Sequence, residues 1–370
     1  MSIFSLKVFL TIHSPVFTIL LIWLVFFIIL VKQCSGACKI ISFNIASILF
    51  LLISVESFCY LSFYPKIKEG KMLHYEGSYN GEYFQRDTIL GYGPMKDTII
   101  SSKKFYNGQM IYDVHYTILK NGLRITPKSH LACNDECIFF FGGSYTFGEG
   151  VNDSSSMPYI VGLHQDKKVH NLGFHGYGPH QMLAAIENRV IDCNPGLAIY
   201  QALPSHIGRA SGFSSWDRHG PKYIFQNGTL KHSGKFSDIY KDMRYSVKKL
   251  RNSYFYQKYF GKGRYQNSDE NTKLYLEIVN AAKNKLESYN SNIEFHVILW
   301  DNDLHNQKSK SLIIDGLKKR KVNYHLVTDI ISDINNNHEK YSLSPNDSHP
   351  NYYAHKIIAQ YIIDSLITSG

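Results

Sequence analysis

Ser144 follows an apolar run, Ile138–Phe141, and the glycine pair Gly142-Gly143. A short apolar run bounded by glycine is typical of a buried strand, and glycines permit a sharp turn close to a bound ligand. Open α/β sheets place their sites at the carboxyl ends of strands, so Ser144 is predicted to lie at such an end. As a nucleophile, this serine would need a histidine base that an acid orients.

The base candidate lies near the other end of the chain, in Asn346-Asp-Ser-His-Pro-Asn351. This stretch is predicted to be a loop that precedes the last helix. His349 can act as the base, and Asp347 is close enough in sequence to orient the imidazole. Helix capping is the alternative interpretation, since Asp, Ser and Asn are ordinary cap residues.

A third stretch, Asn171-Leu-Gly-Phe-His-Gly-Tyr-Gly-Pro-His180, is expected at the end of the second strand. Its glycines could bring a backbone N–H group towards the oxyanion of an acyl-transfer reaction, where donors contribute strongly to catalysis. The alternative is a tight strand-to-helix turn without a catalytic role.

Strands and helices alternate from Ile138 onwards, which predicts a parallel sheet covered by helices. The expected strands are Ile138–Phe141, Lys168–Leu172, Leu197–Ala202, Ile293–Leu299 and Val322–Val327. The expected helices are His180–Asp192, Ser237–Phe260, Asn271–Tyr289, Lys308–Lys319 and Tyr352–Ile367. Residues 211–270 are interpreted as an insertion with few apolar strands.

Two long apolar segments, about 8–31 and 40–64, lie near the N-terminus, and the second contains one charged residue, Glu56. Each could cross ~30 Å of hydrocarbon as a helix, which predicts a transmembrane hairpin in residues 1–65. A signal peptide for the first and a buried core helix for the second are the alternatives. The lysines of the intervening loop favour a cytoplasmic loop and an extracytoplasmic C-terminal part, whereas those just after the second segment favour the reverse.

Pro65 is expected to end the hairpin, and residues 66–130 are expected to form a small β-rich leader that packs on the main domain. Alternating apolar residues over Met110–Leu119 favour antiparallel strands. Asn121-Gly122 is typical of a hairpin turn.

The net charge of +10 and the pI near 9.0 are compatible with nucleic-acid binding. No nucleic-acid-binding motif accompanies the scattered basic residues, which favours a solvated basic face or a membrane-surface contact. The cysteines complete no zinc pattern. In an oxidising compartment Cys193 could pair with Cys133 or Cys137, and reduced buried thiols are the alternative.

The order of these blocks resembles the SGNH/GDSL hydrolase superfamily. Gly91-Tyr-Gly-Pro94 in the leader and Gly176–Gln181 look like those of a bacterial membrane-anchored subgroup. The resemblance implies a flavodoxin-like three-layer α/β/α sandwich over residues 131–370 and hydrolysis or transfer of acyl esters. It also implies that Ser144 is the nucleophile and an oxyanion donor, that Gly176 is a second donor and that His349 is the base.

Three departures from the family pattern stand out. Gly143 occupies the place of the family's usual acid, and Asn346 occupies the usual place of the acid that orients histidine, with Asp347 one residue later. The third block is replaced by Leu203–Arg209, where His206 could serve as an oxyanion donor and Arg209 could bind an acidic or sugar group. A polar loop is the alternative.

We therefore expect a membrane-anchored serine ester hydrolase or O-acyltransferase that needs no metal or organic cofactor. Its substrate would be an acylated, for example acetylated, cell-surface polysaccharide outside the cytoplasm. Other membrane proteins of polysaccharide assembly are candidate partners. A degenerate glycan-binding or scaffold protein and a lipid esterase are the alternatives.

Overall fold

The computed structural model describes residues 15–77, 83–129, 136–237, 253–259, 268–303 and 307–367. These residues fall into two compact units. The first contains the described residues up to Met72 together with 253–259, and the second contains the others from Leu73 onwards.

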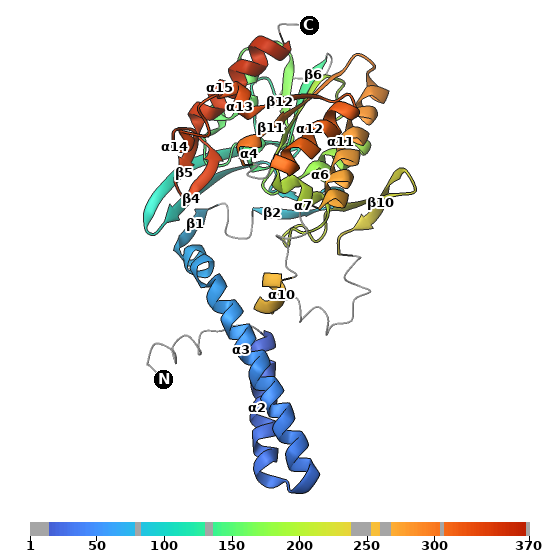
Figure 1. The fold of residues 1–370 in the computed structure, drawn as a ribbon. Coiled ribbons are helices and arrows are strands. Elements are labelled where there is room, and N and C mark those ends of the chain that lie inside the picture. Colours follow the sequence, from blue (N-terminus) through green and yellow to red (C-terminus); the bar gives the residue numbers. More distant parts are fainter. Residues whose placement is uncertain are drawn as a thin grey trace. The chain divides into compact units, whose positions relative to one another are not determined.

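The first unit is helical. Helices α2 (Pro15–Gln33) and α3 (Gly36–Met72) pack side by side, and the short α10 (Tyr254–Tyr259) packs against α3 (Figure 1). Within the described residues, Gly36–Ser62 is the one segment long and apolar enough to span a membrane, and the apolar helix before it, Phe17–Gln33, is shorter. The start of the predicted first span, residues 8–14, lies outside the described residues. A second span therefore stays a prediction.

Helix α3 does not end at Pro65 as predicted, but continues to Met72. A proline removes one backbone hydrogen bond and crowds the preceding turn. Long apolar helices tolerate this loss because neighbouring groups and local adjustments satisfy the freed backbone atoms. The β-rich leader consequently begins at Leu73.

Glu56, the single acid of the second apolar segment, is buried and bound. Its carboxylate accepts hydrogen bonds from the Ser253 hydroxyl at 2.6 Å and from the backbone N–H groups of Tyr254 and Phe255 at 2.7 and 3.0 Å. The acid thus satisfies the first N–H groups of α10, which have no partner within the helix.

The second unit is built on a five-stranded sheet in the order β12-β11-β8-β6-β7, with every neighbouring pair parallel. Counted along the chain this order is 2-1-3-4-5, the flavodoxin-like order. The order reverses at β6, and ligands bind such sheets at the carboxyl end of the strand where this happens. The strands are β6 (Cys137–Phe141), β7 (Lys168–Asn171), β8 (Pro195–Ala202), β11 (Glu294–Leu299) and β12 (Asn323–Leu326).

Helices cover both faces of this sheet (Figure 1). Alternate side chains of β6 enter opposite cores: Phe139 packs with α6, α11 and α12, whereas Phe140 packs with α5 and α15. The helices are α4 (Ser144–Phe147), α5 (Met157–Leu163), α6 (Pro179–Glu187), α7 (Ser205–Ala210), α11 (Asp269–Tyr289), α12 (Gln307–Lys319), α13 (Val327–Ile330), α14 (His338–Tyr341) and α15 (Tyr352–Ile362). Short 3-10 turns lie at Asp153–Ser155 and Asp301–Asp303, and a π-helical turn, Ile363–Ile367, extends α15.

The leader is β-rich, as predicted. Its strands are β1 (Leu73–Gly77), β2 (Phe84–Asp87), β3 (Gly91–Pro94), β4 (Thr98–Tyr106) and β5 (Gln109–Ile118). β1, β4 and β5 form an antiparallel sheet, and β2 pairs with β3. Asn107 and Gly108 turn β4 into β5 with φ of 49° and 79°, the left-handed values that such hairpins require. Tyr116 and Ile118 of β5 share a buried cluster with Phe147 and Phe174, which joins the leader to the parallel sheet.

The insertion at 211–270 contains more strand than predicted. β9 (Pro221–Gln226) and β10 (Thr229–Lys235) form an antiparallel hairpin. Asn227-Gly228 makes its turn, and this dipeptide is itself a hairpin signal. Of the predicted helix Ser237–Phe260, residues 238–252 and 260 lie outside the described part, and 254–259 form α10.

Candidate active site

Ser144 is the first residue of α4, directly after the turn that leaves β6. Gly142 has φ of 150°, and a Cβ there would lie 2.1 Å from Oγ1 of Thr146, so the turn requires glycine. The turn thus places Ser144 at the carboxyl end of β6 and at a helix start, where N–H groups have no partner within the helix. Ser144 is 7% exposed.

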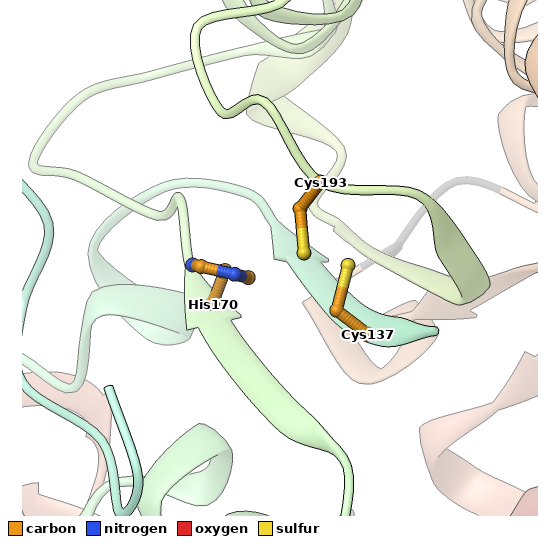
Figure 2. Close-up of side chains that lie close together, drawn as sticks. All are labelled: Cys137, His170 and Cys193. Atoms are coloured by element: carbon orange, nitrogen blue, oxygen red, sulfur yellow. The ribbon is translucent and has the colours of Figure 1, made fainter. Parts of the chain in front are cut away.

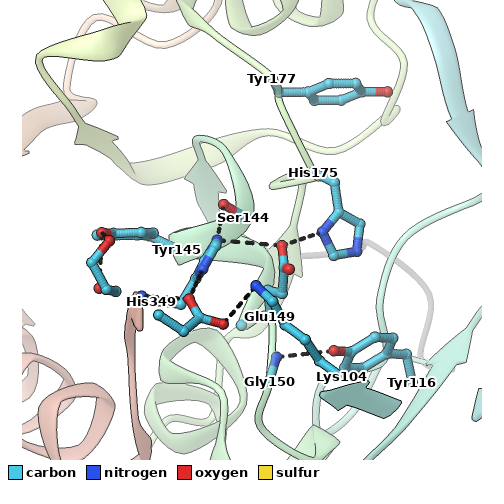
Figure 3. A network of polar contacts seen from close by, with 12 residues as sticks. Lys104, Tyr116, Ser144, Tyr145, Glu149, Gly150, His175, Tyr177 and His349 are labelled. Atoms are coloured by element: carbon cyan, nitrogen blue, oxygen red, sulfur yellow. Dashed lines mark hydrogen bonds and ion pairs between the residues drawn. The ribbon is translucent and has the colours of Figure 1, made fainter. Parts of the chain in front are cut away.

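His349 reaches Ser144 from β14 (Asp347–Pro350), which pairs with β13 (Ser342–Ser344) just before α15. Its Nε2 lies 2.8 Å from Oγ of Ser144, and its Nδ1 lies 2.6 Å from Oδ1 of Asp347 (Figure 3). The three side chains therefore form a continuous hydrogen-bonded chain with the geometry of a serine–histidine–acid triad.

The predicted loop Asn346–Asn351 is largely strand β14, and the helix-capping interpretation holds for its last residue. Asn351 is the N-cap of α15, and its side chain accepts a hydrogen bond from the N–H group of Ala354 at 3.1 Å. Asn346 is exposed, and its backbone N–H donates to Oγ of Ser344. Asp347, not Asn346, contacts the imidazole.

Lys104 of the leader provides a second partner for Asp347. Its Nζ lies 2.8 Å from Oδ2 of Asp347, and the two side chains are only 7% and 2% exposed. Burial raises the pKa of Asp347, but the hydrogen bond and charge of His349 and the charge of Lys104 outweigh it, so this pKa lies below its ordinary value. The acid consequently stays ionised while it orients the ring.

Glu149 brings a second carboxylate to His349. Its Oε2 lies 3.3 Å from Nε2 of His349 and 2.7 Å from Nδ1 of His175 (Figure 3). Burial lowers the pKa of His349, but the negative charges of Glu149 and Asp347 raise it more, so the net pKa is above its ordinary value. Nε2 of His349 thus faces both the serine and an acid.

Arg124, from the leader, holds the segment that follows Ser144, from Phe147 to Asp153, in place. Its guanidinium donates to the carbonyl oxygens of Phe147, Gly148 and Val151, each at 2.7 Å. Nε lies 2.8 Å from Oδ1 of Asp153, and the arginine side chain has no exposed surface. The rigid fork of an arginine suits this multiple contact.

Gly176 lies in the turn after β7 with φ of 74°. Its neighbour His175 binds Glu149, and the hydroxyl of Tyr92 donates to the carbonyl oxygen of His175 at 2.8 Å. These contacts hold the turn beside the Ser144–His349 pair. A backbone donor at Gly176 is compatible with this position.

His206 and Arg209, the replacements in the third block, lie on α7 close to the nucleophile turn. A Cβ at Gly143 would lie 2.8 Å from Nη1 of Arg209 and 3.3 Å from Nε2 of His206. These side chains therefore occupy the space beside Gly143.

The two side chains differ in access. His206 has no exposed surface, and its Nδ1 lies 2.7 Å from the hydroxyl of Tyr200. Burial lowers the pKa of His206 well below its ordinary value. Its Nε2 has no hydrogen-bond partner among the described residues, and an oxyanion role of His206 stays a prediction. Arg209 is partly exposed.

Sequence reasoning missed the roles of Lys104, Glu149 and His175. Glu149 and His175 lie inside the serine block and the second block, so their proximity to the site could have been inferred from those motifs. Lys104 lies in the leader, where no motif marks it.

Cys137, His170 and Cys193 form a separate buried cluster whose donor atoms lie within 4.8 Å of one another (Figure 2). Cys193 is disulfide-bonded and Cys137 is a free thiol, so the pairing of these two is excluded. The other predicted partner, Cys133, lies outside the described residues. Because the Cys193 sulfur is committed to a disulfide, the cluster does not offer three metal ligands.

Comparisons with known proteins give likenesses in structure only. No family model and no curated protein matches the sequence. Matching solved structures include a lipolytic protein of the G-D-S-L family from Desulfitobacterium hafniense, with 13% identity, a TM-score of 0.37, and coverage of 61% of this chain and 97% of that one. An acetyl xylan esterase from Butyrivibrio proteoclasticus matches with 11% identity, a TM-score of 0.36, and coverage of 65% of each chain.

Proposed function

We propose that this protein is a serine ester hydrolase or O-acyltransferase of the SGNH/GDSL type. The observation that carries the proposal is a pair of hydrogen bonds made by His349. Its Nε2 lies 2.8 Å from Oγ of Ser144, and its Nδ1 lies 2.6 Å from Oδ1 of Asp347. The position of Ser144 at the strand where the sheet order reverses supports it further.

The reaction would proceed through an acyl-enzyme. His349 takes the proton of Ser144 as Oγ attacks the ester carbonyl, and Asp347 stabilises the resulting imidazolium. The N–H groups of Ser144 and Gly176 are the proposed donors to the oxyanion. Collapse of the intermediate expels the alcohol, which takes the proton from His349. Water or a sugar hydroxyl then attacks the acyl carbonyl while His349 takes its proton. Collapse of this second intermediate breaks the bond to Oγ of Ser144, which takes the proton back from His349.

We place the substrate, an acylated glycan, outside the cytoplasm. The disulfide of Cys193 supports an oxidising compartment, and the apolar helix Gly36–Ser62 supports a membrane tether. A two-span anchor with a periplasmic catalytic unit is the arrangement we propose. Partner proteins of polysaccharide assembly belong to the same proposal.

The test uses the full chain and a small ester, p-nitrophenyl acetate. Ser144→Ala should abolish turnover. Ser348→Ala is the matched control, because the hydroxyl of Tyr145 donates chiefly to the backbone carbonyl of Ser348, at 2.9 Å, and its contact with the Ser348 hydroxyl is longer, at 3.4 Å. A fluorophosphonate should label the parent chain and not Ser144→Ala. Turnover and labelling that survive in Ser144→Ala would refute the mechanism. A parent chain that neither turns over nor labels would instead indicate a degenerate glycan-binding protein.

A further inference from the structure

Arg209 carries a positive charge that the described part of the chain does not neutralise with an ion pair. Its Nη1 donates to the carbonyl oxygen of Tyr177 at 2.7 Å, and no carboxylate lies within ion-pair distance among the described residues. The nearby Asp217 makes its hydrogen bonds through Oδ2, which lies 2.6 Å from Nε2 of His180 and 2.9 Å from Nε2 of Gln181, whereas its Oδ1 has no partner among the described residues. A partly buried cation without an ion-pair partner favours a bound anion beside it.

The position of Arg209 links this charge to the catalytic serine. Nη1 lies beside Gly143, the residue that precedes Ser144, at 2.8 Å from where a Cβ would stand. Arg209 is partly exposed, so a ligand at Ser144 can approach the guanidinium. An acidic side chain at position 143 would neutralise this charge, and glycine leaves it open.

Trp216 lies next to the same site. It is 59% exposed, whereas Trp300 of the same unit is 3% exposed. Its Nε1 is 3.5 Å from the carbonyl oxygen of Gly176, and its ring centroid is 6.0 Å from Cζ of Arg209. An exposed indole offers a flat apolar face with a polar edge. The C–H groups on one face of a pyranose ring match such a surface.

We propose that Arg209 and Trp216 form a subsite for an acidic sugar, in which the indole supports the ring and the guanidinium binds its carboxylate. The fork of an arginine binds a carboxylate through two parallel hydrogen bonds. This inference rests on the proposed esterase function and narrows its substrate to O-acylated glycans that contain uronic acid residues.

The experiment compares acetate release from two O-acetylated oligosaccharides, an acidic oligogalacturonide and a neutral xylo-oligosaccharide. The parent chain should favour the acidic substrate in kcat/KM. Arg209→Gln should reduce the ratio of acidic to neutral kcat/KM by about 10- to 100-fold, the value of a hydrogen bond to a charged group. Arg189→Gln removes an exposed arginine that pairs with Asp192, and this control should keep the ratio. Added salt should lower the preference of the parent chain.

Trp216→Ala should raise KM for both oligosaccharides more than for p-nitrophenyl acetate, which has no sugar ring. Trp216→Phe, which keeps an aromatic face, should restore part of the difference. The subsite proposal would be overturned if the parent chain did not prefer the acidic oligosaccharide. It would also be overturned if Arg209→Gln lowered kcat/KM equally for the acidic and the neutral oligosaccharide. If the parent chain did not hydrolyse p-nitrophenyl acetate at all, the proposed function would be overturned instead, so the two failures are distinguishable.

Discussion

Oε2 of Glu149 lies 3.3 Å from Nε2 of His349, the same ring nitrogen that lies 2.8 Å from Oγ of Ser144. With Asp347 at Nδ1, the ring is held between two carboxylates. A cation is favoured between two anions, so Glu149 favours the protonated form of the base. This relationship predicts how activity depends on pH.

Glu149→Gln should shift the acidic limb of the pH–activity profile to lower pH. Catalysis requires neutral His349, and the Glu149 charge raises its pKa, so removal of that charge lets the ring lose its proton at lower pH. The kcat/KM for p-nitrophenyl acetate across pH measures the shift. Glu136→Gln, which removes an exposed acid paired with Lys167, should leave the limb in place. An unshifted or oppositely shifted limb in Glu149→Gln would contradict the electrostatic role.

Lys104→Met should destabilise the fold and reduce turnover together. The substitution leaves the buried charge of Asp347 without its lysine, and breaking a buried ion pair in this way typically costs about 3–5 kcal/mol. Denaturant unfolding gives the stability and ester hydrolysis gives the activity.

The neighbouring Lys103→Met provides the control for Lys104. Lys103 pairs with Asp113 at 2.8 Å, but both side chains are more than a third exposed. Exposed pairs contribute about 0–1 kcal/mol. Equal losses for the two variants would show that burial of the Lys104–Asp347 pair has no special effect.

Asp347→Asn should lower kcat by roughly 10³–10⁴-fold, as expected when the acid of a triad can no longer hold the histidine tautomer. Asn346→Ala removes the exposed neighbour, whose backbone rather than side chain makes the recorded contact, and should have little effect. Steady-state kinetics with a short ester distinguish the two. If Asn346→Ala were the damaging change, the assignment of the acid would be wrong.

Arg124→Lys should loosen the segment between Ser144 and Asp153. Lysine keeps the charge but cannot make the three carbonyl contacts of the guanidinium. We expect a loss of about 1–3 kcal/mol in the free energy of unfolding from unsatisfied buried acceptors. Faster amide hydrogen exchange within 144–153 should accompany it. Arg189→Lys at the protein surface should change neither measurement.

Several features could be predicted from sequence because the signals are local. The buried strand before Ser144, the turn that requires Gly142, and the alternation of strands and helices all follow from short-range patterns. The hairpin turn at Asn107-Gly108 and the extension of α3 beyond Pro65 show the limit of such signals. Asn107-Gly108 is one of several glycine-containing turns, and its sequence does not distinguish it from the others. Whether a helix continues through Pro65 depends on neighbouring structure, which the proline alone does not reveal.

For the candidate triad, residue types and motif order predicted Ser144 and His349, and left Asp347 or Asn346 as the acid. Which side chains surround the triad was decided only by the tertiary structure. Lys104 contacts Asp347 across 243 positions of sequence, and Arg209 lies beside Gly143 because α7 follows the neighbouring strand of the sheet. Burial and charge compensation depend on which distant segments meet, and no periodicity or spacing encodes that. The sequence alone therefore determined the candidate nucleophile and the candidate base, whereas the packing of the leader and α7 around them decided the electrostatics of the site.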